Sequence, residues 1–249
     1  MHPSKPGKHV TSPLNPESRA SYAEVPHPPL TSRALTHREE RKNDVYYYLS
    51  PKHKMRVVSV VEPCRLALAL EYEFDPDVVS YVERPRCLSV EDRQIELCFW
   101  VSRRSGAESF SIFRRQSKPS IQAVRAEERV CSKLLDAART AGLTLAIRKP
   151  QSLILARVAN ATRLELLPYV QAADALAGLT VFADAVLEHM RTHRVSSFHA
   201  IERTLCGPFD WRDVRSATCW LIHRGLLNID VNQRLTVSTR VSLPEVVHA

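Results

Sequence analysis

The chain has no long hydrophobic run, and this absence excludes a helix that crosses a membrane. No apolar stretch approaches the ~20 residues that a bilayer requires. The opening residues, MHPSKPGKHV, contain no apolar segment of the kind found in secretory signal peptides. With 44% hydrophobic and 25% charged residues, the composition is that of a globular protein rather than a fibrous or wholly disordered one. We therefore expect a cytoplasmic chain with no membrane partner.

Closely spaced cysteine pairs are also missing. The six cysteines are scattered and form no C-x-x-C pair, which excludes a zinc ribbon and a disulfide scaffold. Reduced thiols of this kind are typical of a cytosolic protein. No internal repeat is visible, and the length of 249 residues allows one large domain or two smaller ones.

Positive charge, in contrast, is in excess. The chain contains 35 Lys and Arg residues against 27 Asp and Glu residues, which gives a formal net charge of +8. This excess is compatible with a polyanionic partner such as DNA, although many soluble proteins carry as much. The charge alone therefore leaves a nucleic-acid partner open.

The N-terminal residues 1–44 differ in composition from the rest of the chain. Seven of the 16 prolines lie before residue 30, among Ser, His and Lys residues. Such a segment buries too little apolar surface to offset the entropy that ordering it would cost. We therefore predict a disordered, proline-rich arm over 1–44, with ordered structure from about Val45.

Residues 45–168 mix strand and helix patterns. After an aromatic segment, the predicted elements are a helix, a strand, a β-hairpin around the turn RRSG, a helix and a strand. In order, these segments are 45–50, 67–73, 78–81, 93–101 with 107–115, 124–142 and 143–147. This order predicts an α/β layer with a small mixed sheet.

Two of these segments also predict which side chains are buried. Residues 93–101 alternate, which predicts one continuous strand with Glu96, Cys98 and Trp100 on one face and Ile95, Leu97, Phe99 and Val101 on the other. The helix over 124–142 is amphipathic and ends at Gly142. Its predicted inward side chains are Val130, Leu134, Leu135 and Ala138.

Residues 151–249 have mainly helical patterns. Two helices with a break near Pro168 are followed by three short helices, for which Ser196 or Ser197 and Asp210 are suitable N-caps. Two strands around an Asn-Gln turn close the chain. Three helices followed by a β-hairpin are the outline of a winged helix, which we predict over 169–249.

The motif LEYEFDPDVVSYVERP at residues 70–85, together with Ser59 and Glu62, resembles the TnsA-type endonuclease subunits of heteromeric transposases. The resemblance implies a restriction-endonuclease-like core over 45–168, followed by a winged-helix domain that contacts an ATPase regulator. It also implies transposon-end DNA and a DDE-type transposase as partners. An active subunit of this family nicks the strand that the transposase leaves uncut.

The sequence departs from this family at the positions that carry its chemistry. Glu62 matches the first carboxylate, but the second acidic position is occupied by Cys98. Ile112 and Arg114 lie where the family has a carboxylate or amide and a lysine. A thiol is a poor ligand for Mg²⁺, and an isoleucine binds no metal at all. We therefore expect that the nuclease chemistry is lost and that Mg²⁺ is needed only if the chain is active, with Glu62 as a ligand.

Two alternatives remain open from the sequence. Glu96 lies two residues from Cys98, and a shift in strand register would let it replace the missing carboxylate. The chain would then be an active, metal-dependent DNA-nicking endonuclease that uses Glu62 and Glu96. In the other alternative, the chain is a DNA-binding regulator that acts through the winged helix and keeps the nuclease fold only as a scaffold.

Cations gather in two places where DNA phosphates could bind. One group lies at the turn and exit of the predicted hairpin, and the other lies on the predicted recognition helix. The candidate DNA-binding residues are Arg103, Arg104, Arg114, Arg115, Lys118, Arg212 and Arg215. A solvated face is the alternative for the hairpin group, and a protein-binding surface for the helix. His189 and His193 have the spacing of metal ligands, but no third ligand is apparent, which favours surface histidines.

Overall fold

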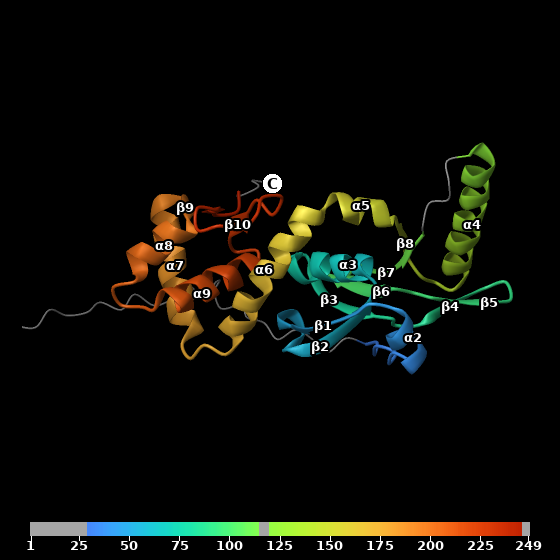
Figure 1. The fold of residues 1–249 in the computed structure, drawn as a ribbon, viewed down its shortest axis with the longest axis horizontal. Coiled ribbons are helices and arrows are strands. Elements are labelled where there is room, and N and C mark those ends of the chain that lie inside the picture. The colour runs from blue at the N-terminus through green and yellow to red at the C-terminus, as the bar shows by residue number, and fades with distance from the viewer. Residues whose placement is uncertain (1–28, 115–119, 246–249) are drawn as a thin grey trace, which may run out of the picture.

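The computed structural model describes residues 29–114 and 120–245. A sheet half, residues 29–155, and a helical half, residues 157–245, lie side by side, and helix α6 (Arg157–Asp174) of the helical half packs against the sheet half (Figure 1). The fold is mixed α/β, with a small mixed sheet and several helices. No described helix is both long enough and apolar enough to span a membrane.

The central sheet has four strands in the order β3-β6-β7-β8. Neighbouring strands β3, β6 and β7 are antiparallel, whereas β8 is parallel to β7 and is reached through helix α4. Helix α3 precedes β3 along the chain. These elements are α3 (Pro63–Phe74), β3 (Val78–Glu83), β6 (Phe99–Arg103), β7 (Glu108–Phe113), α4 (Ile121–Thr140) and β8 (Leu145–Arg148). These elements follow the predicted helix–strand–hairpin–helix–strand order, but an unpredicted pair of strands lies between the first strand and the hairpin.

The prediction that ordered structure begins near Val45 is wrong, because ordered residues precede it in the chain. Residues 1–28 lie outside the described residues, but helix α2 (His37–Lys42) and the segment before it are part of the fold. Thr36 caps α2, because its side chain accepts a hydrogen bond from the Glu39 N–H while the Glu39 side chain bonds back to the cap. Arg33 also bonds to Glu39 and to the distant Glu96, so ionic contacts hold this segment where apolar burial is scarce.

Two small sheets flank the central one. Strands β1 (Val45–Ser50) and β2 (Arg56–Val61) form an antiparallel pair, and a short 3-10 helix, η2 (Pro51–His53), follows β1. The turn between them continues through Lys54 and Met55, both at positive φ. Strands β4 (Cys87–Val90) and β5 (Arg93–Glu96) form a second pair.

The single strand predicted over 93–101 is broken between Glu96 and Phe99. Strand β5 pairs with β4, whereas β6 pairs with β3 and β7 in the central sheet. The partner changes between neighbouring residues: the Leu97 N–H donates to Arg86, and the Cys98 N–H donates to Ser111. Helices cover both faces of the sheet, so the residues on both faces are buried and the alternation does not separate an inner from an outer face.

Helix α4 packs on the sheet only through its C-terminal half. Leu134 and Ala138 are buried as predicted, but Val130 and Leu135 are 37% and 40% exposed, which corrects the predicted inward face. The N-terminal half projects away from the sheet (Figure 1). Gly142 has a φ of 68° just past the helix end, as expected for a C′ glycine.

The helical half follows the predicted helices with one correction. The break lies at Ala156 rather than at Pro168, which is an exposed residue inside α6, so the predicted boundary between 168 and 169 falls within a helix. A proline is tolerated there because water can reach the carbonyl group whose hydrogen bond it removes. The elements are α5 (Pro150–Leu155), α6 (Arg157–Asp174), α7 (Leu179–His193), β9 (Val195–Ser197), α8 (Phe198–Leu205), α9 (Trp211–His223), β10 (Asn228–Ile229) and β11 (Arg240–Ser242).

Local signals place several of these elements correctly. Ser197 and Asp210 cap α8 and α9 by accepting hydrogen bonds from backbone N–H groups of the first turn. The two predicted terminal strands pair as β10 and β11, and β9 joins them in the order β10-β11-β9. Helix α9 lies at the centre of this half, packed against α6, α7 and α8, and every residue from Ser216 to His223 is buried.

Candidate functional site

Glu62 lies where strand β2 turns into helix α3. It is the N-cap of α3, with Pro63 at the first helical position, and its N–H donates to the Asp44 carbonyl at 3.0 Å. Its backbone angles, φ 70° and ψ 141°, belong to a region that side chains other than glycine rarely adopt. The glutamate is therefore held at a strained position, directly before a helix N-terminus.

Cys98 and Ile112 come together in the core of the sheet half. The Cys98 N–H donates to the carbonyl of Ser111, the residue before Ile112, at 2.8 Å. Both side chains belong to the same apolar cluster and are only 3% and 6% exposed. Burial raises the pKa of the Cys98 thiol, with the charge of Arg65 opposing it, so the thiol is protonated at neutral pH. Neither residue offers an anionic ligand.

Arg65, in the first turn of α3, is the centre of the candidate site. Its Nη1 donates to Glu96 Oε1 at 2.9 Å. Although burial opposes its charge, the neighbouring carboxylates of Glu96 and Glu62 raise the pKa of Arg65. We name Arg65, Glu96, Glu62 and the neighbouring Cys98 the Arg65 cluster. Sequence reasoning predicted three of its members but missed the arginine, for which the i, i+3 spacing from Glu62 was the available signal.

Glu96, the proposed substitute carboxylate, is engaged by a second arginine. Arg33 Nε donates to Glu96 Oε2 at 3.0 Å, and its Nη2 bonds to the same oxygen. Arg84 is 2% exposed and holds this arrangement in place, because it donates to the Arg33 carbonyl at 3.0 Å and to the Ser59 hydroxyl at 2.8 Å. The fold thus brings Glu96 to the cluster, but two guanidinium groups neutralise it.

The positions that the resemblance predicts as catalytic do not fit Mg²⁺. Mg²⁺ requires oxygen ligands in near-octahedral geometry, whereas these positions hold the Glu62 carboxylate, the protonated Cys98 thiol and the Ile112 side chain. Within residues 29–114 and 120–245, no group of three or more His, Cys, Asp or Glu side chains is arranged to hold a metal ion.

Two arginines of the β6–β7 hairpin bond to the turn between α3 and β3. Arg103 Nη1 donates to Asp75 at 3.1 Å and to Asp77 at 2.9 Å, and Arg104 Nε donates to the carbonyl of Pro76 at 2.7 Å. Arg103 is therefore neutralised within the chain. The other two predicted hairpin cations, Arg115 and Lys118, lie outside the described residues.

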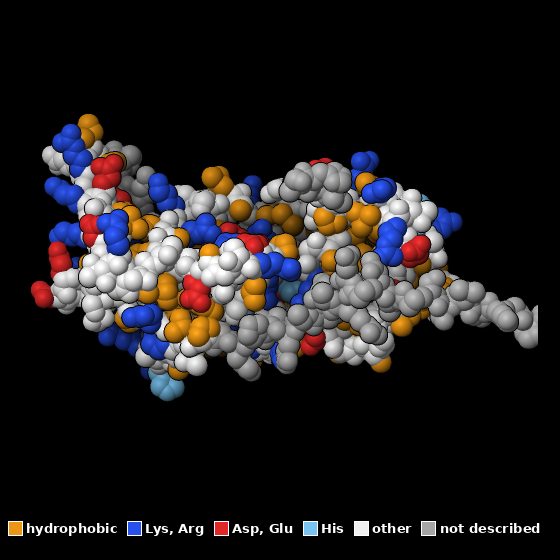
Figure 2. Space-filling view, turned by 180° about the vertical axis from the view of Figure 1, so that it is seen from behind, with side chains coloured by type: hydrophobic (Ala, Val, Ile, Leu, Met, Phe, Trp, Pro, Cys, Tyr) orange, Lys and Arg blue, Asp and Glu red, His pale blue; other side chains and the backbone are white. Residues whose placement is uncertain are grey.

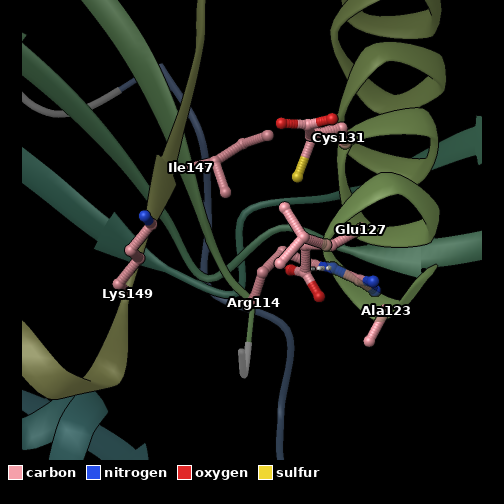
Figure 3. A pocket seen from close by; sticks show the side chains of 8 residues that line it. Arg114, Ala123, Glu127, Cys131, Ile147 and Lys149 are labelled. Atoms are coloured by element: carbon pink, nitrogen blue, oxygen red, sulfur yellow. Dashed lines mark ion pairs between the residues drawn. The ribbon is translucent and has the colours of Figure 1, made fainter. Parts of the chain in front are cut away.

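Arg114 lines a cavity of about 210 Å³ between the ends of β7 and β8 and the projecting half of α4. Its Nε lies 3.7 Å from a carboxylate oxygen of Glu127, with Cys131 further along the helix and Lys149 on the strand side (Figure 3). Arg114 is thus paired with α4. Seen from behind, Lys and Arg side chains are dispersed among acidic and apolar ones over the described surface rather than gathered in one band (Figure 2).

The two candidate arginines of α9 have different environments. Arg215 is half-buried, bonds to both carboxylate oxygens of Glu202 at 2.5 and 3.0 Å, and lies among aromatic rings that include Tyr169 and Phe198. Arg212 is exposed and lies over the ring of Trp211. Because the rest of α9 is buried, only its first turn is available to a partner.

A buried carboxylate joins the two halves of the molecule. Glu73, near the end of α3, is fully buried and accepts hydrogen bonds from the hydroxyls of Ser50 and Tyr81, from the Lys52 N–H and from His223 Nε2 of α9 at 2.8 Å. These donors hold the pKa of Glu73 below its usual value despite its burial. Burial lowers the pKa of His223, so its imidazole is neutral. Sequence reasoning missed this group, whose signal was an acidic residue within an apolar helix.

The histidine pair in α7 is not a surface pair. His189 is 8% exposed, its Nε2 lies 3.2 Å from the Ser196 hydroxyl, and its ring stacks on that of His193. Burial lowers the pKa of His189. The expectation of two surface histidines is therefore wrong for His189.

Comparison with protein-family models gives no match, and comparison with curated protein sequences gives none either. A functional assignment therefore depends on the residues of this chain and on their geometry.

Proposed function

We propose that the chain is a TnsA-like subunit of a heteromeric DNA transposase whose nuclease chemistry has been lost. The observation that carries this proposal is the order of the core: helix α3, the antiparallel strands β3, β6 and β7, helix α4, and the parallel strand β8. We interpret this order as that of a restriction-endonuclease-like core in which the strands β4 and β5 are inserted between β3 and β6. Its agreement with the position of the motif at residues 70–85 supports the resemblance.

The residues at the family's catalytic positions support the loss of cleavage. Metal-assisted phosphodiester hydrolysis needs carboxylates that hold a divalent cation, which activates water and stabilises the leaving oxygen. Here Cys98 is protonated, Ile112 is part of the apolar core, and Glu96 is paired with Arg33 and Arg65. The alternative of an active nuclease that uses Glu62 and Glu96 is disfavoured by these pairs.

The helical half supports a role in assembly. Its order of helix, strand, helix, helix, strand, strand and its sheet order β10-β11-β9 support the winged helix that we propose for this half. A winged helix that reads DNA places an exposed recognition helix in the major groove. Because α9 is covered by α6, α7 and α8, we infer that this half contacts a protein, the ATPase regulator, rather than base edges. A regulator that acts through α9 is correspondingly disfavoured.

The test combines assembly with cleavage on the same DNA. Transposon-end DNA is incubated with the DDE-type transposase and the ATPase regulator, with and without this chain, in Mg²⁺ or Mn²⁺. We expect this chain to enter the protein–DNA complex and to add no nick. Nicking that Glu62→Ala abolishes would refute the loss of chemistry, and failure to join the complex would refute the subunit role. Asp136→Ala, on an exposed face of α4 and outside the helical half, is the matched control for Glu62→Ala.

A further inference from the structure

Three arginines converge at the site where the resemblance places an acidic metal centre. Arg65 and Arg33 both bond to the Glu96 carboxylate, and the buried Arg84 holds the Arg33 carbonyl. In the Arg65 cluster, the Arg65 and Glu96 side chains are 20% and 22% exposed, so their ion pair is largely shielded from water. Shielding of this kind makes an unpaired charge costly and a paired one strongly held.

Arg65 lies at an electrostatically unfavourable position on its helix. A cation in the first turn of a helix lies at the positive end of the helix dipole, where negative groups are favoured instead. Arg65 has this unfavourable place in α3, as the third residue of the helix after the N-cap Glu62. The neighbouring carboxylates of Glu96 and Glu62 are what makes a positive charge favourable there.

Glu62 likewise has an unfavourable local conformation, because its backbone is strained. Its positive φ of 70° would suit glycine, yet the residue carries a carboxylate whose charge acts on Arg65. Strain of this kind persists where the surrounding structure requires the side chain. The backbone bond from the Glu62 N–H to Asp44 fixes this conformation.

We propose that the Arg65 guanidinium is the resident cation of this site and takes the place of a divalent metal ion between Glu62 and Glu96. This inference rests on the proposed function, because the restriction-endonuclease-like core is what identifies the position as a metal site. A guanidinium is permanently charged and offers five N–H donors, so it neutralises and orients carboxylates. It has no open coordination position and activates no water. The site is therefore ionically complete without metal.

Removal of the resident cation should create a metal site. We would measure Mn²⁺ binding to the full chain by the loss of the free-ion electron paramagnetic resonance signal, in wild type, Arg65→Lys, Arg65→Ala and Arg33→Ala with Arg65→Ala. We expect the double variant to bind one Mn²⁺ at least tenfold more tightly than wild type. Arg65→Lys, which keeps the charge, should behave as wild type. Addition of Glu96→Gln to the double variant should abolish the gain.

Folding of each variant is checked by near-ultraviolet circular dichroism. If the double variant folds only when Mn²⁺ is added, the result supports the proposal, since the metal then replaces the missing charge. A folded double variant that binds Mn²⁺ no more tightly than wild type overturns it, as does an unfolded one that Mn²⁺ does not restore. Saturable Mn²⁺ binding by the wild-type chain that Glu62→Gln removes also overturns it.

This experiment separates the two proposals. It uses the isolated chain, so a failure to join the transposase complex leaves its result unaffected. Conversely, a chain that joins the complex but has no latent metal site keeps the subunit role and loses only the resident-cation proposal.

Discussion

The contact between the sheet half and the helical half can be tested where Gly225 approaches Pro76. Gly225 ends α9 with a φ of +73°, and a Cβ added to it would lie 2.5 Å from Pro76 Cβ and 2.9 Å from Pro76 Cγ. Pro76 cannot easily move, because its ring is rigid and Arg104 holds its carbonyl at 2.7 Å. Gly225→Ala therefore combines a strained backbone conformation with a clash between the halves.

Gly142→Ala is the matched control for this variant. Gly142 has a φ of +68°, and nothing lies within 4 Å of an added Cβ. The left-handed conformation costs about 1–2 kcal/mol for alanine, and the stiffer unfolded chain returns roughly 0.4–1 kcal/mol. We therefore expect Gly142→Ala to lower the free energy of unfolding by about 1 kcal/mol.

For Gly225→Ala, overpacking adds about 1–3 kcal/mol, so the total loss is about 2–4 kcal/mol. Urea unfolding followed by tryptophan fluorescence and by far-ultraviolet circular dichroism measures both variants. Trp100 reports on the sheet half, whereas Trp211 and Trp220 report on the helical half. Equal destabilisation by the two substitutions would refute the contact between Gly225 and Pro76.

Three further predictions concern buried or strained groups. Glu73→Ala should lower the free energy of unfolding by about 3–5 kcal/mol, because it removes the carboxylate that four buried donors share, and Glu73→Gln should cost less. Equal losses in urea unfolding would contradict the role of the charge. Burial lowers the pKa of His53 from 6.5 to about 4, so the unfolded chain binds the extra proton between these values. Stability should therefore fall as the pH drops from 6.5 towards 4, by up to about 3 kcal/mol, and His53→Gln should flatten this dependence in thermal unfolding. Glu62→Gly should be more stable than Glu62→Gln by about 1 kcal/mol, because both lose the carboxylate and only glycine relieves the positive φ; a less stable glycine variant would argue against strain.

Local sequence signals predicted the elements whose ends depend on neighbouring residues. Ser197 and Asp210 cap helices, Gly142 ends one, and the turn after Arg103 closes the β6–β7 hairpin, because each depends on bonds within a few residues. The helix break predicted near Pro168 is wrong for a different reason. The cost of a proline within a helix depends on whether water reaches the helix on that side, and the sequence does not show which side of a helix is exposed to solvent.

Elements that depend on distant contacts could not be predicted in this way. The strand predicted over 93–101 breaks because the Cys98 N–H bonds to the Ser111 carbonyl of β7, whereas β5 pairs with β4. The alternating pattern does not show which strand each part pairs with. The segment around Arg33 is ordered by bonds to Glu96, 63 residues away. The resemblance placed Glu62 and Cys98 at one site, but nothing in it indicated that arginines would neutralise that site.

The hydrogen bond between Glu73 and His223 also has a consequence for how the chain is made. The two residues are 150 positions apart, so at ~5–20 residues per second His223 is synthesised roughly 8–30 s after Glu73. During that interval the nascent sheet half carries a carboxylate that lacks one of its donors and a Phe74 ring that lacks its cover. Completion of the first half therefore waits for α9, and a chain that stops before this helix should be a substrate for chaperones and proteases rather than a stable fragment.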